Sequence, residues 1–339
     1  MNILFDFNHP VDVNFFKNSI KLLAKEQHKI ILTYRERGRL KDILQYEIGQ
    51  YTLTCIGSHR KGFIRKVVGQ LYRDYKFYCF QKENSINLSV CFGATNAIAS
   101  AVNRIPYLAF DDDAEYKIPF YHANLFATRH IIPDFIKVTK KNIFKYRGFK
   151  ELAYLHPNYF QPDISEIEKY NLRKDKYIFI REVANVSLNY KKENTPIQAI
   201  IKYLKKTDYS IVLSLEDKKL IVKFEKDCII LQEPIKDIYS LIKYALFVIS
   251  SGDTVAREAC LLGTPSIYTG GRSMSVNKEL IETGCMYKME SYDKIKSQID
   301  ALCDNNEKKR IEKLIAEKIA DEWDDTTQVI LEHIKDFEN

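Results

Sequence analysis

The sequence predicts an α/β protein in which two doubly wound, Rossmann-like domains face each other across a ligand cleft. Three observations support this prediction. The 339 residues are too many for one average domain and sufficient for two. Strand-like apolar runs alternate with amphipathic helical stretches, an order that gives parallel sheets covered by helices on both faces. The alternation stops within residues 154–175 and then starts again, so we expect the same architecture twice.

The first half supplies the elements of one sheet. The apolar run at residues 2–7 is typical of a strand, and residues 12–25 carry apolar side chains at helical spacing. Further strands are expected at residues 29–34, 51–56, 88–92 and 106–110, and helices at residues 40–48, 59–82 and 94–102.

A polar stretch with two X-Pro steps separates this half from the next, and we place the linker there. The predicted domains are therefore 1–158 and 165–319. In the second domain, strands are expected at residues 177–181, 210–214, 228–231, 246–250 and 265–268, and a helix at residues 196–205.

Composition narrows the function classes. Hydrophobic residues make up 45% of the chain, which excludes a disordered protein. The seven cysteines are scattered without CxxC spacing, so we expect free thiols in a reducing compartment and no zinc site. No apolar run approaches ~20 residues, and the start runs directly into a strand, so we expect a cytoplasmic protein. The net charge of +7 fits phosphate, anionic lipid or nucleic-acid partners, or solubility alone.

The most informative motif is a Ser/Gly turn between a strand and a helix. The strand ends at Ser250, Ser251-Gly252 forms the turn, and the helix begins near Asp253. Free backbone N–H groups and the helix dipole at such a turn suit a diphosphate. Gly263 then ends the helix.

Within this helix, Thr254 and Glu258 are four residues apart and share a face, opposite a face expected to be buried. Glu258 can accept hydrogen bonds from ribose hydroxyls. The alternative interpretation is that Ser251 is a simple N-cap and Glu258 a surface acid in an ion pair.

Two further candidate site residues lie at the end of the first strand of each domain. His9, held extended before Pro10, can act as a general base, or it can merely cap a helix. Arg181 ends the first strand of the second domain and can clamp a phosphate, or form a surface ion pair.

An acidic turn follows the strand at residues 106–110. Its carboxylates can bind a metal, orient a base or bind sugar hydroxyls. We take Asp112 as a catalytic candidate and Asp111 and Glu115 as cleft residues, and we expect Asp113 to lie in a solvated loop.

The helix at residues 59–82 combines basic residues with an apolar stripe at four-residue spacing, Phe63, Val67, Leu71 and Tyr75. Such a helix can lie on an anionic membrane surface, or its stripe can face the sheet.

Taken together, these motifs resemble a prokaryotic family catalogued as a domain of unknown function and grouped with the GT-B glycosyltransferases and the UDP-N-acetylglucosamine 2-epimerases. The resemblance covers nearly the whole chain. It rests on these segments: Asn8-His9-Pro10, Phe92-Gly93, the acidic turn, residues 146–155, and Ser251-Gly252 through Glu258 to Gly263-Thr264-Pro265.

The resemblance implies a GT-B fold that binds a donor nucleotide in the C-terminal domain and an acceptor in the N-terminal domain, without a metal or cofactor. It implies diphosphate and ribose sites at residues 250–254 and Glu258, an acceptor site that includes Asn8 and Gly93, and a last helix, about 320–339, that packs back on the first domain. UDP is the default nucleotide, and a CMP-linked acid sugar is the other option.

These inferences lead to one principal hypothesis and two alternatives. The first is a glycosyltransferase of surface polysaccharide or glycolipid synthesis, with a glycan or lipid-linked acceptor and a peripheral place on the inner membrane face. The second is a nucleotide-sugar 2-epimerase, although the start and the paired acids typical of those enzymes are missing. The third is a non-catalytic binder of anionic glycan or nucleic acid; nothing in the sequence resembles a nucleic-acid module.

Overall fold

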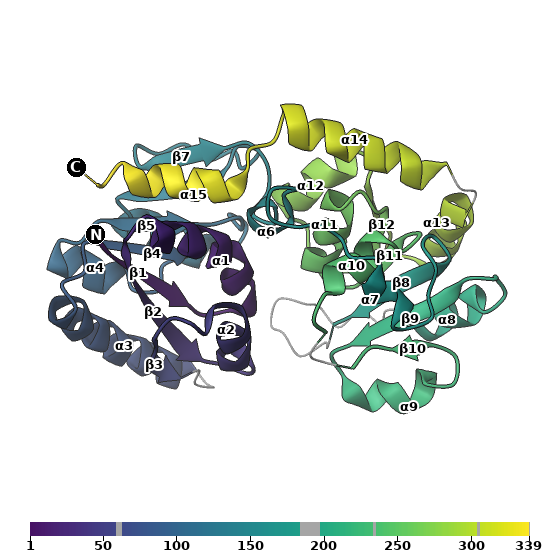
Figure 1. Ribbon diagram of the computed structural model, residues 1–339, viewed down its shortest axis with the longest axis horizontal. Helices are drawn as coiled ribbons and strands as arrows, with labels where there is room; N and C mark the ends of the chain where they lie inside the picture. The colour runs from purple at the N-terminus through teal and green to yellow at the C-terminus, as the bar shows by residue number, and fades with distance from the viewer. Residues whose placement is uncertain (59–62, 184–196, 233–234, 304–305, 339) are drawn as a thin grey trace. The chain divides into compact units, whose positions relative to one another are not determined.

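The computed structural model describes residues 1–58, 63–183, 197–232, 235–303 and 306–338, and the side chains of residues 63–67 are outside that description. The chain divides into two compact units (Figure 1). Unit 1 contains Met1–Tyr159 and Trp323–Asn339, and unit 2 contains Phe160–Glu322. Each unit has one parallel sheet with helices, which confirms the α/β fold class.

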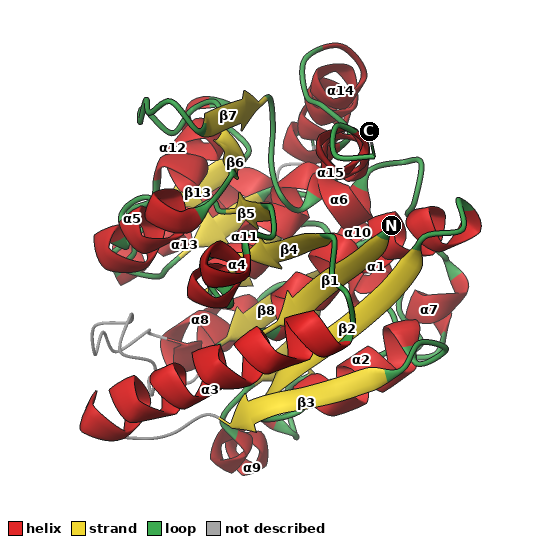
Figure 2. Cartoon of the chain, turned by 90° about the vertical axis from the view of Figure 1, so that its left-hand side faces the viewer, coloured by secondary structure: helices red, strands yellow, loops and turns green. Residues whose placement is uncertain are grey.

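The sheet of unit 1 has seven strands in the order β3-β2-β1-β4-β5-β6-β7. The strands are β1 (Asn2–Phe7), β2 (Lys29–Glu36), β3 (Leu53–Ser58), β4 (Leu88–Phe92), β5 (Tyr107–Phe110), β6 (Arg129–Pro133) and β7 (Ile143–Tyr146). The helices are α1 (Pro10–Lys25), α2 (Leu40–Ile48), α3 (Phe63–Glu83), α4 (Ala97–Asn103), α5 (Lys117–Phe126), α6 (Leu152–Leu155) and α15 (Thr326–Lys335). Figure 2 shows α3 and α4 in front of the strands and α1 and α2 behind them.

The sheet of unit 2 has six strands in the order β10-β9-β8-β11-β12-β13. The strands are β8 (Tyr177–Glu182), β9 (Ser210–Leu215), β10 (Ile229–Ile230), β11 (Val248–Ser250), β12 (Ser266–Tyr268) and β13 (Met286–Lys288). The helices are α7 (Ser165–Glu168), α8 (Ile197–Leu204), the 3-10 turn η1 (Lys218–Leu220), α9 (Ile221–Phe224), α10 (Ile238–Lys243), α11 (Asp253–Leu261), α12 (Ser275–Glu282), α13 (Tyr292–Cys303) and α14 (Glu307–Asp321).

Strand order fixes where each unit can bind a ligand. In unit 1 the chain builds outward from β1 to β2 and β3, and then from β4 to the other edge. In unit 2 the same reversal lies between β8 and β11. Open α/β sheets bind ligands at the carboxyl ends of the strands where the order reverses. We therefore expect ligands to bind at the loops after β1, β4, β8 and β11.

Burial explains why these segments are strands. Five consecutive residues of β1, Ile3–Phe7, are buried, as expected for a central parallel strand covered on both faces. Phe15 and Phe16 of α1 pack edge-to-face against each other, and Phe15 also meets Phe110 of β5, with ring centroids 4.7 and 5.3 Å apart. Phe16 also packs against Phe7, the last residue of β1 before the loop that carries His9.

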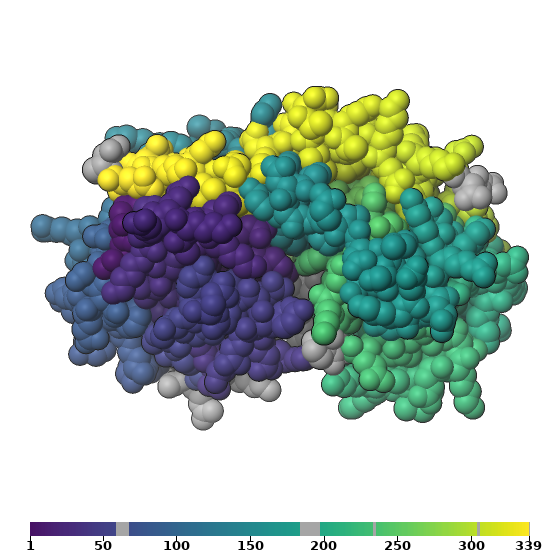
Figure 3. Space-filling model, viewed as in Figure 1, coloured from purple at the N-terminus to yellow at the C-terminus, as the bar shows by residue number. Residues whose placement is uncertain are grey.

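The C-terminal segment belongs to unit 1. The space-filling view shows the last helix against the N-terminal residues, and α15 contacts both α1 and α6 (Figure 3). The Trp323 ring lies 4.9 Å from that of Phe149, and the Thr326 hydroxyl donates to the Phe149 carbonyl over 2.8 Å. Residues from opposite ends of the chain thus complete one core.

Helix α3 differs from the expected pattern. Leu71 and Tyr75 were expected on a stripe that faces either the membrane or the sheet, and both side chains are exposed. The row that faces the sheet contains Arg73, Phe77 and Gln81 instead, because Arg73 forms a buried ion pair there. The expected stripe residues Phe63 and Val67 lie outside the described side chains. In the described part of the chain, no helix is both long and apolar enough to cross a bilayer.

Candidate functional site

The loop after β1 is held by the start of α1. Pro10 opens the helix, and the Asp12 carboxylate accepts hydrogen bonds from the backbone N–H groups of Asn8 and His9 over 2.9 and 2.8 Å. The His9 ring is exposed, and its Nδ1 accepts from the Val11 N–H over 3.3 Å. Nδ1 as acceptor places the proton of the neutral ring on Nε2. His9 therefore caps the helix, and its exposed imidazole lies at the switch point; its role as a general base stays a prediction.

Two titratable groups at this loop, His9 and Asp12, have pKa values shifted from their usual range. The pKa of His9 is lowered to about 4. The main cause is the surrounding protein, which disfavours the charged ring even though solvent reaches the side chain. The positive charges of Arg37 and Lys150 lower it further. Burial raises the pKa of Asp12 to about 7, although the two backbone N–H groups act in the opposite direction. His9 is thus uncharged at pH 7, as a general base must be.

A buried ion pair lies behind the loop. The Arg73 Nη2 contacts both carboxylate oxygens of Asp6 over 2.9 and 2.7 Å, and the two side chains are 1% and 0% exposed. The Thr33 hydroxyl also donates to Asp6 over 2.8 Å, and the Asn8 amide donates over 3.2 Å. Through Asn8, the pair supports the backbone that carries His9.

The first two carboxylates of the acidic turn after β5, those of Asp111 and Asp112, contact different partners. Asp112 pairs with Lys150 over 2.7 Å, and both side chains are buried. The Asp111 Oδ2 lies 3.9 Å from the Nε2 of His130, a buried histidine of β6. Asp111 also accepts from the Asp113 N–H over 3.0 Å. Glu115 is exposed at the end of the turn.

The electrostatics of the turn follow from this burial. Burial raises the pKa of Asp111 to about 7, and the charges of Asp112 and Asp113 add to the effect. Burial lowers the pKa of His130 to about 4, so this ring is neutral. The turn therefore presents a carboxyl group that titrates near neutrality beside the ion pair of Asp112.

Lys150 is the residue of unit 1 that sequence reasoning missed. It follows β7, and its ammonium group lies 5.2 Å from the centroid of the Phe92 ring at the end of β4. Gly148, with φ of +116°, turns the chain toward it, and a Cβ there would lie 3.1 Å from the Trp323 Cβ. The signal in the sequence was the acidic turn itself, since carboxylates that close together require a nearby cation.

Gly93 ends β4 beside the turn. Its φ is +76°, which glycine adopts without strain, and its N–H donates to the Phe110 carbonyl over 2.8 Å. The structure thus brings Asn8, His9, Gly93 and the Asp111–Asp112 turn to one edge of the sheet of unit 1.

In unit 2, the Ser/Gly turn lies at the switch point between β8 and β11. Helix α11 begins at Asp253 with Gly252 as N-cap. The Ser250 hydroxyl accepts from the Gly252 N–H over 3.1 Å, and the Ser251 hydroxyl accepts from the Val183 N–H over 2.9 Å. A Cβ on Gly252 would lie 2.9 Å from the Val183 Cγ1, so a side chain there would have to displace Val183. The two serines fix the turn rather than cap the helix.

The two charged candidates of unit 2 are already engaged. Arg181 donates to the Ser214 hydroxyl and the Glu216 carboxylate, each over 2.7 Å, so its guanidinium lies over the end of β9. Glu258 is buried, which argues against the alternative interpretation of a surface acid, and the Tyr239 hydroxyl donates to it over a long 3.4 Å. Thr254 is half-buried on the same helix.

Sequence reasoning also missed two arginines at the start of α11. Arg257 and Arg272 lie 3.2 and 3.3 Å from the Oδ2 of Asp253, and Arg257 also donates to Asn277 over 2.9 Å. Arg257 is 1% exposed and Arg272 is partly exposed. Asp253 offsets one of these two positive charges, so one net positive charge remains beside the positive end of the helix dipole.

Two other features lie apart from these loops. Among the described residues, one group has the geometry to hold a metal ion, namely Glu26, His28 and Glu338. It precedes β2, at the amino end of the sheet, and Lys335 already lies 3.3 Å from Glu26.

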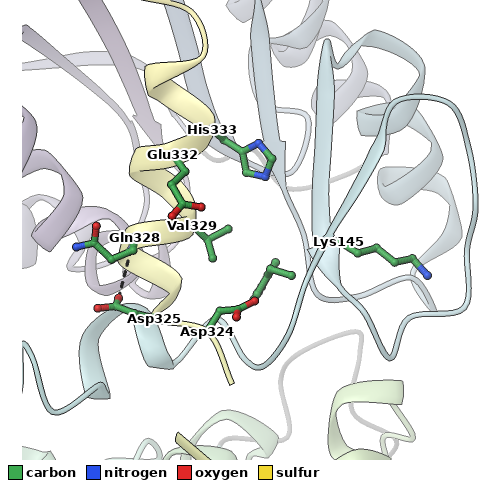
Figure 4. A pocket seen from close by; sticks show the side chains of 8 residues that line it. Lys145, Asp324, Asp325, Gln328, Val329, Glu332 and His333 are labelled. Carbon is green, nitrogen blue, oxygen red and sulfur yellow. Dashed lines mark hydrogen bonds between the residues drawn. The ribbon is translucent and has the colours of Figure 1, made fainter. Parts of the chain in front are cut away.

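A pocket of about 280 Å³ lies between β7 and α15 (Figure 4). Its acids hold the helix in place: Asp325 caps α15 at Thr327 and Gln328, and Asp324 pairs with Arg147 over 2.7 Å. None of the predicted site residues lines this pocket.

Comparison with known proteins identifies the family. Residues 1–338 match the family described as "Protein of unknown function (DUF354)", and the chain belongs to it. The uncharacterized protein MJ0665 of Methanocaldococcus jannaschii is 25% identical over 311 residues, which cover 83% of this chain and 86% of that protein.

Solved structures show the same fold. The UDP-GlcNAc 2-epimerase of M. jannaschii, in complex with UDP-GlcNAc and UDP, has a TM-score of 0.72 at 14% identity and covers 99% of both chains. MurG of Acinetobacter baumannii has a TM-score of 0.66 at 12% identity, and the match covers 99% of this chain and 100% of that one. These likenesses establish the GT-B-like fold.

Proposed function

We propose that this chain is a glycosyltransferase that moves a sugar from a nucleotide-sugar donor to a glycan or lipid-linked acceptor. The observation that carries the proposal is the turn at Ser251-Gly252. It lies at the switch point of unit 2 and opens a nine-residue helix, and Val183 leaves little room for a side chain at Gly252. A diphosphate can approach such a turn closely and interact with the first N–H groups of the helix.

The remaining donor contacts come from the same helix. Glu258 would accept hydrogen bonds from ribose hydroxyls, with Tyr239 as its neighbour. Arg272, partly exposed beside Asp253, would stabilise the charge that builds on the leaving nucleotide. Arg181 would join them only by exchanging its present contacts with Ser214 and Glu216.

Unit 1 would bind the acceptor. His9 would take the proton of the acceptor hydroxyl, whose oxygen then forms a bond to the anomeric carbon while the nucleotide leaves with the electrons of the broken bond. Because Nδ1 now accepts from Val11, base catalysis requires the ring to exchange this contact for the acceptor hydroxyl. Asp112, paired with Lys150, and Asp111 would bind neighbouring hydroxyls.

Nucleotide-dependent thermal unfolding tests the donor site. A ligand at ~100 times its Kd stabilises by about 2.7 kcal/mol, which shifts Tm by several degrees. UDP, CMP, GDP, ADP and their sugars are compared on wild type, Glu258→Gln and the exposed control Glu290→Gln. We expect one nucleotide to shift wild type and control but not Glu258→Gln. If no nucleotide shifts wild type, the donor proposal is wrong.

The second candidate is a nucleotide-sugar 2-epimerase. Asp12 and Asp111, with pKa values near 7, favour it, since epimerisation removes a proton and returns it. Turnover of a nucleotide sugar without any acceptor would support this candidate, and turnover only with an acceptor would exclude it.

A further inference from the structure

The helices α3, α4 and α5 expose an unusual amount of apolar surface. Among the described residues, nine of the thirteen exposed large apolar side chains lie on these helices or immediately before α5. Their exposed fractions range from 48% to 85%. We call this set the α3–α5 surface: Val68, Leu71, Tyr72, Tyr75, Val102, Tyr116, Ile118, Tyr121 and Leu125.

The side chains follow helical periodicity on the solvent side. On α3, residues 68, 71, 72 and 75 form one stripe, and on α5 residues 118, 121 and 125 form another. Each helix also has a sheet-facing row, marked by Phe77 on α3 and by Phe120 on α5. Each helix therefore packs on the sheet through a buried row, and the exposed apolar stripe is not needed for that packing.

The three helices are neighbours. Helix α3 packs on α4, and α4 packs on α5. Figure 2 shows all three on the same side of the sheet of unit 1. The two stripes therefore belong to one surface, with Val102 of α4 between them. Contiguous apolar surface of this kind marks a binding site in a folded protein.

Charge and residue type indicate what binds there. Among the side chains that the structure describes on and beside these helices, the exposed charged ones are four basic and two acidic: Lys76, Lys82, Arg104, Lys117, Glu83 and Glu115. Four of the nine apolar side chains are tyrosines, which place an apolar ring in lipid and a hydroxyl in water. In a symmetric pair of copies this surface would meet itself, and its basic rim would face a basic rim.

We propose that the α3–α5 surface binds the face of an anionic lipid bilayer, with both helices lying in the headgroup region. Apolar stripes enter the acyl boundary while lysines contact anionic headgroups, as in interfacial helices. The biological role of this lipid binding, to bring a lipid-linked acceptor to unit 1, rests on the proposed function. Lipid binding itself requires no nucleotide.

Vesicle flotation tests the proposal with the full chain. Vesicles of phosphatidylcholine alone are compared with vesicles that also contain phosphatidylglycerol. We expect binding to the anionic vesicles only. Leu71→Glu and Ile118→Glu should each reduce it about tenfold or more, and the charge-removing variants Lys76→Gln and Lys117→Gln by about fivefold each. The matched control is Val222→Glu, an exposed valine of α9 in unit 2.

The outcomes separate this inference from the proposed function. Thermal shifts with nucleotide, measured on the same variants, should equal those of wild type, because the donor site lies in unit 2. The lipid proposal is overturned if wild type does not float with anionic vesicles, or if Val222→Glu loses as much binding as Leu71→Glu. It is also overturned if light scattering shows a dimer that Leu71→Glu dissociates, since the surface would then join two copies.

Discussion

Replacing Arg73 with methionine should leave the Asp6 carboxylate in the core without its cation. The two side chains are 1% and 0% exposed, and the guanidinium contacts both carboxylate oxygens at 2.9 and 2.7 Å. Removing one member of such a pair costs about 3–5 kcal/mol, because the remaining charge stays buried without compensation. Thr33 and Asn8 would still donate to Asp6, so we expect the lower end of that range.

Urea unfolding followed by circular dichroism measures the cost. The control is Lys82→Met, at an exposed position of the same helix, which should change stability by less than about 0.5 kcal/mol. The double variant Asp6→Leu/Arg73→Met should recover most of the loss, since neither charge remains. A loss below about 1 kcal/mol for Arg73→Met would refute the reasoning that the buried Asp6 carboxylate depends on this cation.

Two further perturbations test individual positions. Gly252→Ala should cost about 1–3 kcal/mol, because its Cβ would lie 2.9 Å from the Val183 Cγ1, and should abolish any nucleotide-induced shift. An unchanged shift would contradict the close approach of a ligand to this turn. His130→Phe should flatten the loss of stability on acidification. The native pKa of His130 is about 4 against 6.5 unfolded, so its contribution is present above pH 6.5 and declines toward pH 4 by up to about 3 kcal/mol. Asp12 and Asp111 titrate with the opposite sign but remain in both proteins. Equal pH profiles of Tm for wild type and variant would show that the ring ionises freely.

Helices and strands whose apolar residues recur at a regular spacing could be predicted from the sequence. The helix at residues 40–48 and the strand at residues 88–92 have the predicted bounds, and β11, Gly252 and α11 follow one another as the Ser/Gly motif indicates. Strands β6, β7 and β13, of five, four and three residues, were not predicted, because none of them shows a clear alternation of apolar and polar residues.

Burial of charge was harder to predict because the partners are distant in sequence. Arg73 is 67 residues from Asp6, and Lys150 is 38 residues from Asp112, so no local pattern shows either pair. The same limit applies to Glu258. Its spacing predicts a helix face, but only the packing of neighbouring elements decides whether that face meets solvent. Loop positions at strand ends were predictable because topology fixes them, whereas the partners of each side chain depend on the whole fold.

The return of Trp323–Asn339 to unit 1 has a consequence for biosynthesis. During translation, residues 1–159 leave the ribosome without the helix that covers α1 and α6. At ~5–20 residues per second, that helix follows roughly 10–30 s later. Unit 2 is itself made in this interval and is complete only at Glu322, a few residues before α15, so neither unit can complete its fold until nearly the whole chain has been made. Until α15 docks, the nascent first half exposes the apolar surface of α1, which makes it a client for chaperones.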